Sequence, residues 1–174
     1  MLTRSQVENR TLSSFNSIAY GSPIDQRVSN AKSPKRAKKI DPEPSIEFGT
    51  FVEDKQIVLV LPIRTVSEAN CFEGWKKKHA RHKKQKFAVQ AHLNLVVNKI
   101  TLPCEITLTR YASRSLDLHD NLPYSFKFIS DSIADLLIPG KKSGFADSDL
   151  RLTWKYSQIK SKEYAIRIQI KSLA

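Results

Sequence analysis

The chain has 174 residues and a formal net charge of +12, with 29 Lys and Arg residues against 17 Asp and Glu residues. This length fits one domain with a tail, or two very small domains, and the hydrophobic content of 40% excludes a wholly disordered chain. No run approaches the roughly 18 apolar residues of a membrane span, and we expect no secretory signal after the first four residues. The charge excess favours a polyanionic partner, either nucleic acid or an anionic membrane surface.

Residues 1–46 are rich in Ser, Asn and Arg and show no sustained periodicity, so we predict a basic, flexible tail. The basic run at residues 33–39 is typical of a solvated arm that adds nonspecific affinity, which we favour over a nuclear-targeting signal. Residues 47–174 are then expected to form one domain.

The first elements of that domain follow from hydrophobic patterning. Residues 56–62 form an almost continuous apolar run that predicts a buried strand ending at Pro62. Residues 69–98 show a helical pattern, and residues 102–112 alternate as a strand does. The apolar stripe expected to pack on the core side of the helix consists of Phe72, Trp75, Ala80, Phe87, Ala91 and Leu95.

A second helix is predicted from Asn121, a suitable capping residue, with Pro123 in its first turn. Its apolar face comprises Phe126, Ile129, Ile133, Leu136 and Leu137, while Lys127, Asp131 and Asp135 lie on another face. Residues 150–156 and 164–170 predict two further strands. The resulting order, β-α-β-α-β-β, predicts an α/β (α+β) fold with a small mixed sheet packed against helices.

Residues 75–86 contain seven basic side chains and no acid. Such dense charge on one helix is self-repelling, and neutralising phosphates would relieve it, so nucleic-acid binding is favoured over a generic solvated face. A membrane surface is disfavoured because the apolar stripe is needed for the core. The candidate DNA-binding residues of this helix are Lys76, Lys77, Lys78, Arg81, Lys83, Lys84 and Lys86.

Other potential ligands in the chain are less suggestive of a metal. His79 and His82 stand three residues apart on the same helix, but their cationic neighbours oppose a dication. Cys71 and Cys104 lack the spacing of a metal or redox motif, so we expect small core side chains in a reducing compartment.

Residues 101–139 are the one net-acidic region, at −2, and they contain Asp117 and Asp120. If the loop before the next strand folds back, Asp147 or Asp149 would join them, and such carboxylates suit Mg²⁺ or Mn²⁺. The metal could activate water for phosphodiester hydrolysis, and Lys127 could stabilise the transition state. The structural alternative assigns these residues to helix capping, a turn and an ion pair between Lys127 and Asp131; by spacing alone it is slightly favoured.

The order of these features resembles the RusA family of Holliday-junction resolvases. The corresponding features are a strand ending at Pro62, then Asn70, a long helix, a strand, Asp117 with Asp120 and Asn121, Lys127, and Asp147 with Asp149. The likeness covers residues 56–171. The acidic pair is spaced Asp-x-x-Asp where the family has Asp-x-Asp, and Asp149, beside the strand, is our choice for the later ligand.

The resemblance implies a Mg²⁺-dependent endonuclease, phage-encoded or bacterial and cytoplasmic, that acts on four-way DNA junctions as a homodimer without a small-molecule cofactor. Asp117, Asp120, Lys127 and Asp149 would be catalytic, and Asp117, Asp120, Asp149 or Asp147 would bind the metal. Asn70 would join the basic helix in binding DNA. The alternative is a noncatalytic DNA-binding module on the same fold with an eroded metal site. A third hypothesis is a structural protein whose basic tail packs nucleic acid.

Overall fold

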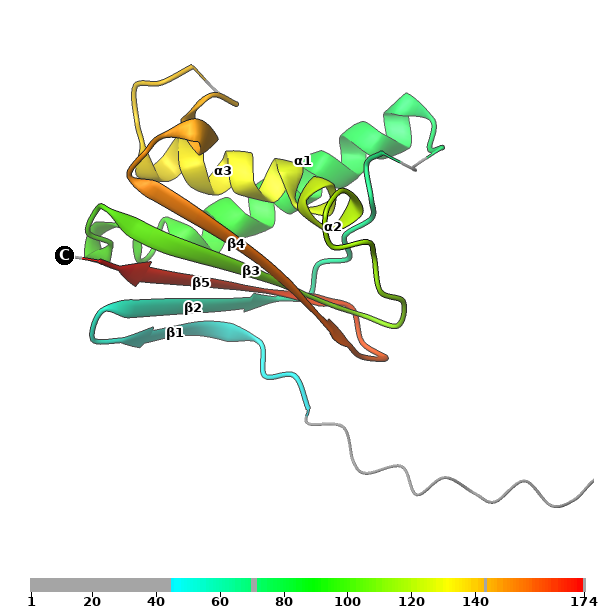
Figure 1. The fold of residues 1–174 in the computed structure, drawn as a ribbon, viewed down its shortest axis with the longest axis horizontal. Coiled ribbons are helices and arrows are strands. Elements are labelled where there is room, and N and C mark those ends of the chain that lie inside the picture. Colours follow the sequence, from blue (N-terminus) through cyan, green and yellow to red (C-terminus); the bar gives the residue numbers. More distant parts are fainter. Residues whose placement is uncertain (1–44, 70–71, 143, 174) are drawn as a thin grey trace, which may run out of the picture. The chain divides into compact units, whose positions relative to one another are not determined.

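A computed structural model describes residues 45–69, 72–142 and 144–173 of the chain (Figure 1). The predicted tail therefore lies almost entirely outside the described residues, as do Asn70 and Cys71. The elements in chain order are β1 (Gly49–Glu53), β2 (Gln56–Leu61), α1 (Trp75–Leu93), η1 (Val97–Lys99), β3 (Cys104–Ala112), α2 (Asn121–Ser125), α3 (Lys127–Leu137), η2 (Ala146–Ser148), β4 (Leu152–Lys160) and β5 (Ala165–Ser172).

The five strands form one mixed sheet in the order β1-β2-β5-β3-β4. β5 is antiparallel to both β2 and β3, so β2 and β3 run in the same direction, and β4 is parallel to β3. The chain crosses from β2 to β3 through α1 and from β3 to β4 through α2 and α3. Both crossovers progress the same way across the sheet, which places the helices on one face (Figure 1).

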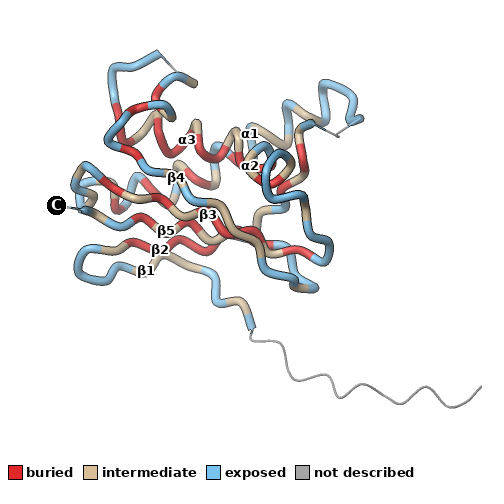
Figure 2. The backbone as a smooth tube through the Cα atoms, viewed as in Figure 1, coloured by how far each residue is buried: buried red, intermediate tan, exposed pale blue. Residues whose placement is uncertain are grey.

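The core fills the space between the helices and this face of the sheet. Alternate residues of the central strands point into it, among them Leu59, Ile106 and Ile168, and α3 contributes Ile129 and Ile133. Figure 2 shows this burial along the central strands and the inner sides of the helices. The structure confirms the predicted fold class, a small mixed sheet packed with helices.

The predicted element order was wrong in two places. β1 was not predicted, because its five residues follow a Pro-containing segment and carry little apolar signal. It pairs with β2 through a tight hairpin in which Asp54 has a φ of 21°. β1 therefore forms because it pairs with β2, and its own hydrophobic pattern does not predict a strand.

The second predicted helix is divided at Phe126 into α2 and α3. The Ser125 hydroxyl donates to the Leu122 carbonyl (2.7 Å), while the Phe126 N–H donates to the Pro123 carbonyl (3.0 Å). The Phe126 N–H thus bonds a carbonyl three residues back, where a continuous α-helix bonds four residues back, and Phe126 has a φ of −103° and a ψ of −1°, so the helix is interrupted there. Phe126 itself is fully buried, as are most residues of the predicted apolar face. Asp120 precedes the first helical residue in place of the predicted cap, Asn121.

The predicted core stripe of the first helix was also wrong. α1 is shorter than residues 69–98, and Phe72, Trp75, Phe87 and Leu95 are exposed. The buried residues of α1 are Gln85, Val89 and Leu93, spaced four apart on the opposite side. The premise that an apolar stripe of this helix is reserved for the core therefore fails.

Candidate functional site

The parallel direction of β2 and β3 brings the segments that follow them to the same edge of the sheet. These segments border a cleft of about 630 Å³, with Ser67 and Glu73 on one side and Asp117 and Asn121 on the other. Clefts at the carboxyl ends of neighbouring strands are common ligand sites in α/β proteins. Of the predicted catalytic and metal-binding residues, Asp117 alone lines this cleft, together with its neighbour Asn121.

Local hydrogen bonds hold the acidic loop beside this cleft. The backbone N–H of His119 donates to Asp117 Oδ1 (2.8 Å), and the N–H of Leu122 donates to the Asp117 carbonyl (2.8 Å). The Ser67 hydroxyl donates to Asn121 Oδ1, which ties the loop to the segment after β2. Asp117 and Asp120 are exposed, and Asp120 does not line the cleft.

Lys127, at the start of α3, lies between two carboxylates. Its ammonium group is 2.7 Å from Asp131 Oδ1 and 3.0 Å from Asp147 Oδ2. Burial alone would lower the pKa of Lys127, but hydrogen bonds to these two carboxylates raise it above its ordinary value. The pairing of Lys127 with Asp131 agrees with the structural alternative drawn from the sequence.

Asp149 lies where β4 begins and is engaged by two cations. Arg151 Nε donates to Oδ1 (2.9 Å), and Arg151 Nη2 (3.0 Å) and Lys141 Nζ (2.7 Å) donate to Oδ2. The hydrogen bonds from Arg151 and then Lys141 hold the pKa of Asp149 well below its usual range. This carboxylate thus organises the entry into β4.

The predicted ligand set is therefore split. Asp117 follows the end of β3, whereas Asp149 precedes the start of the parallel strand β4, and β3 alone spans about 25 Å. Within the part of the chain that the structure describes, no three His, Cys, Asp or Glu side chains are placed to hold one metal ion. The four carboxylates, as arranged, do not fit a shared Mg²⁺ site.

Glu68, which the sequence analysis did not single out, neutralises part of α1. Its carboxylate contacts Arg81, Lys78 Nζ (3.1 Å) and His82 Nε2 (3.1 Å). Burial alone would raise the pKa of Glu68, but the hydrogen bonds from these three side chains lower it below the ordinary value. Its place a few residues before a basic helix was the available signal, but only the fold shows which bases it reaches.

The seven predicted bases of α1 thus fall into two groups. Lys78 and Arg81 pair with Glu68, Arg81 also pairs with Glu73 (3.0 Å), and Lys86 lies 3.8 Å from Asp135. Across the described residues, no acid forms an ion pair with the other four. We call Lys76, Lys77, Lys83 and Lys84 the outer lysines of α1; all are exposed.

The outer lysines have neighbours suited to nucleic acid. Trp75 and Phe87, on the same helix, are 73% and 72% exposed. Lys77 and Lys84 also line a groove of about 620 Å³ between α1 and the segment after β2, and Arg64 lies on that groove. Cations beside exposed aromatic rings are the usual components of surfaces that bind phosphates and bases.

The first turn of α1 is positively charged, which is unfavourable at the N-terminus of a helix. Its first turn contains Lys76, Lys77 and Lys78 and no acid, and Gly74 provides no side-chain cap. The exposed N–H groups at a helix start favour negative charge, so lysines there cost stability unless an anion is bound. Glu68 supplies the anion for Lys78, so the arrangement favours an external anion at Lys76 and Lys77.

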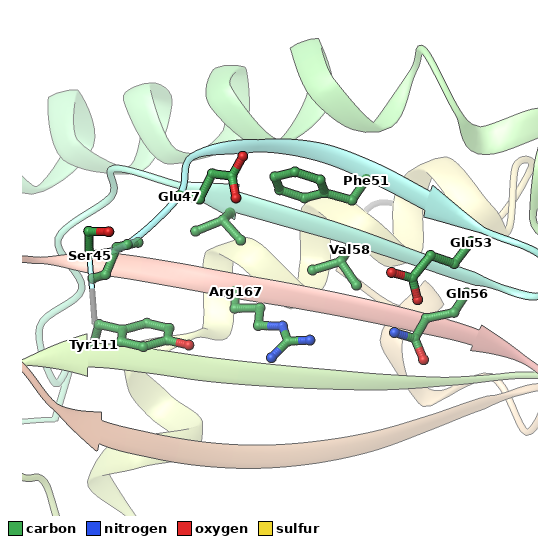
Figure 3. A pocket seen from close by; sticks show the side chains of 10 residues that line it. Ser45, Glu47, Phe51, Glu53, Gln56, Val58, Tyr111 and Arg167 are labelled. Atoms are coloured by element: carbon green, nitrogen blue, oxygen red, sulfur yellow. The ribbon is translucent and has the colours of Figure 1, made fainter. Parts of the chain in front are cut away.

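The sheet face opposite the helices contains a different cavity, of about 360 Å³. Figure 3 shows Arg167 in it, close to Tyr111, with Glu53 and Gln56 toward the other end. Among described residues, no hydrogen-bond partner is found for Arg167 Nε. None of the predicted site residues lines this cavity, so it is separate from the cleft and the basic groove.

Comparison with protein families finds no family that this sequence matches, and comparison with curated proteins finds no similar protein. The resemblance to the RusA family therefore stays a prediction. None of the helices in the described segments has the length and apolar character to cross a bilayer.

Proposed function

We propose that this chain binds DNA through phosphate contacts made by the outer lysines of α1. The observation that carries the proposal is the presence of these four exposed lysines, with no ion-pair partner among the described residues, beside Trp75 and the groove lined by Arg64. Lysines that neutralise phosphates release condensed counterions, which supplies affinity without base recognition. The expected preference for branched DNA rests on the resemblance to the RusA family.

A titration of the full chain with labelled duplex and four-way junction DNA at several salt concentrations tests this proposal. We expect the logarithm of the binding constant to fall linearly with the logarithm of the salt concentration, with a slope near −3.6 if about four phosphates are neutralised. Anionic vesicles serve as the comparison, because the aromatic side chains of α1 are exposed. Strong vesicle binding without DNA binding would overturn the proposal.

A second candidate function is cleavage of such junctions. It is favoured by one observation: Asp117, Asn121 and Glu73 line a single cleft next to the start of the basic helix. Oxygen donors of this kind suit Mg²⁺, although the four predicted carboxylates are not gathered there. The cleft therefore supports a search for hydrolysis but provides no assigned ligand set.

Incubation with a synthetic four-way junction, with and without Mg²⁺, followed by a denaturing gel, tests the second candidate. Cleavage at the cleft predicts Mg²⁺-dependent nicks that Asp117→Asn abolishes while junction binding persists; Asp120→Asn, outside the cleft, tests the second carboxylate that the resemblance implies. Cleavage by both variants at the wild-type rate would show that these carboxylates are not catalytic. Binding without any cleavage would favour the noncatalytic module.

A further inference from the structure

Arg110, in β3, is a buried cation that lacks a charged partner. It is 6% exposed, its Nε donates to the Thr65 hydroxyl (3.1 Å), and its Nη1 donates to the Arg114 carbonyl (2.7 Å). Both acceptors are neutral, and no carboxylate of the described residues forms an ion pair with Arg110. Buried charges in proteins are almost always paired, because an isolated one loses its hydration without compensation.

Two further arginines lie at the same corner of the sheet. Arg64 follows β2 and stacks on the ring of Tyr164, 4.8 Å from its centroid. Arg114 follows β3, is exposed, and offers its carbonyl to Arg110. Neither Arg64 nor Arg114 is ion-paired to any acid that the structure describes. Glu163, adjacent to Tyr164 in the chain, forms no ion pair with them either.

The hydroxyl of Tyr164 lies close to the positive charges at this corner. It lies 3.4 Å from the Ser113 hydroxyl. The pKa of Tyr164 is lowered first by that hydrogen bond, and then by the charges of Arg64, Arg110 and Arg114. Burial lowers the pKa of Arg110; the neighbouring Tyr164 opposes this effect, and the charge of Arg64 adds to it. Arg64 lies on the ring of Tyr164, and Arg110 holds the backbone carbonyl of Arg114, so the three residues surround one small region.

We propose that Arg64, Arg110 and Arg114 form a binding site for a phosphate group. Guanidinium groups recognise phosphate oxygens through paired, charge-assisted hydrogen bonds, and a bound dianion would supply the missing counter-charge of Arg110. Arg64 also lines the groove that Lys77 and Lys84 border. The phosphate can therefore come from a free phosphate ion or from a DNA backbone; the DNA source rests on the proposed function.

Thermal unfolding of the full chain in inorganic phosphate, against sodium chloride of equal ionic strength, tests the site. Phosphate should raise the melting temperature of the wild type, because a ligand that binds only the folded state stabilises it. Arg64→Gln and Arg114→Gln, both at exposed positions, should raise the apparent dissociation constant for phosphate at least tenfold. Lys99→Gln and Lys171→Gln, which remove exposed charges elsewhere, should leave the phosphate effect unchanged.

Arg110→Met provides a further comparison for the buried position. If it folds, it should lose the phosphate effect while melting in chloride no lower than the wild type. Should Arg110→Met not fold, Arg64→Gln and Arg114→Gln still decide the matter. An equal phosphate effect in these two variants and the wild type, or none in the wild type, would overturn the proposal.

Duplex DNA without terminal phosphates distinguishes the two sources. If Arg64→Gln and Arg114→Gln weaken binding of this DNA at least threefold, the site takes a backbone phosphate. If they lose the phosphate effect but bind DNA as the wild type does, the site takes a free phosphate. A wild type that shows the arginine-dependent phosphate effect but binds no DNA would refute the proposed function and leave the site standing.

Discussion

At the scale of single residues, Glu68 determines how many cations of α1 are left for an external partner. Its buried carboxylate pairs with Lys78, Arg81 and His82, so these side chains stabilise the folded chain. The ion pair between Lys127 and Asp131 was readable from a spacing of four residues on one helix. The contacts of Glu68, and the approach of Asp147 to Lys127, join segments far apart in the sequence, which no local pattern specifies.

Replacing Glu68 with Gln should have two opposite effects. It removes the shared counter-charge, so we expect unfolding in urea at neutral pH to show a loss of about 2 kcal/mol. It also leaves Lys78 and Arg81 with less neutralisation, so DNA affinity should rise. Glu73→Gln, at a more exposed carboxylate, should cost less than about 1 kcal/mol. Equal stability of Glu68→Gln and the wild type would contradict this assignment.

The same residue gives a pH dependence of defined sign. The pKa of Glu68 is lower in the folded chain than its ordinary value of 4.5. Its contribution is therefore complete above that ordinary value and is lost as the pH falls through the lowered, folded pKa. The difference in unfolding free energy between the wild type and Glu68→Gln should shrink in that acidic range. If this difference in unfolding free energy stays constant from pH 7 to pH 2, the lowered pKa of Glu68 is refuted.

At the scale of elements, the sequence predicted strands better than it predicted α1. Cys104, Ile106 and Leu108 alternate and are all buried, because one face of β3 packs on the core. The buried side of α1 instead includes Gln85, whose amide donates to the Arg64 carbonyl (3.2 Å), so hydrophobicity could not reveal its orientation. The candidate cleft was predictable only in part, since it depends on β2 and β3 ending at one edge.

Two identical substitutions test the orientation of α1 and the turn after it. Leu93 is fully buried, whereas Leu95 is 75% exposed. Leu93→Ala should lower the free energy of unfolding by about 3 kcal/mol, because it leaves a cavity in the core. Leu95→Ala should change it by less than about 0.5 kcal/mol. Chemical denaturation of both variants measures the contrast, and a loss for Leu95→Ala as large as that for Leu93→Ala would contradict the observed orientation.

At the scale of the molecule, the net charge of +12 is unevenly compensated. Acids pair with Lys78, Arg81 and Lys86 of α1. The outer lysines and the corner of Arg64, Arg110 and Arg114 have no ion-pair partners among the residues described. A uniform basic coat would bind polyanions equally from every side. The observed distribution instead predicts that charges on α1 matter more for DNA binding than equal charges elsewhere.

The most direct test compares two charge-reversed variants of equal net charge in a duplex DNA titration across salt concentrations. Lys83→Glu with Lys84→Glu alters the outer lysines, and Lys99→Glu with Lys171→Glu alters exposed lysines away from α1. The first variant should bind at least tenfold more weakly than the wild type, with a salt slope about 2 units shallower, and the second should stay within threefold. Equal weakening by both variants, or none by the first, would contradict the account.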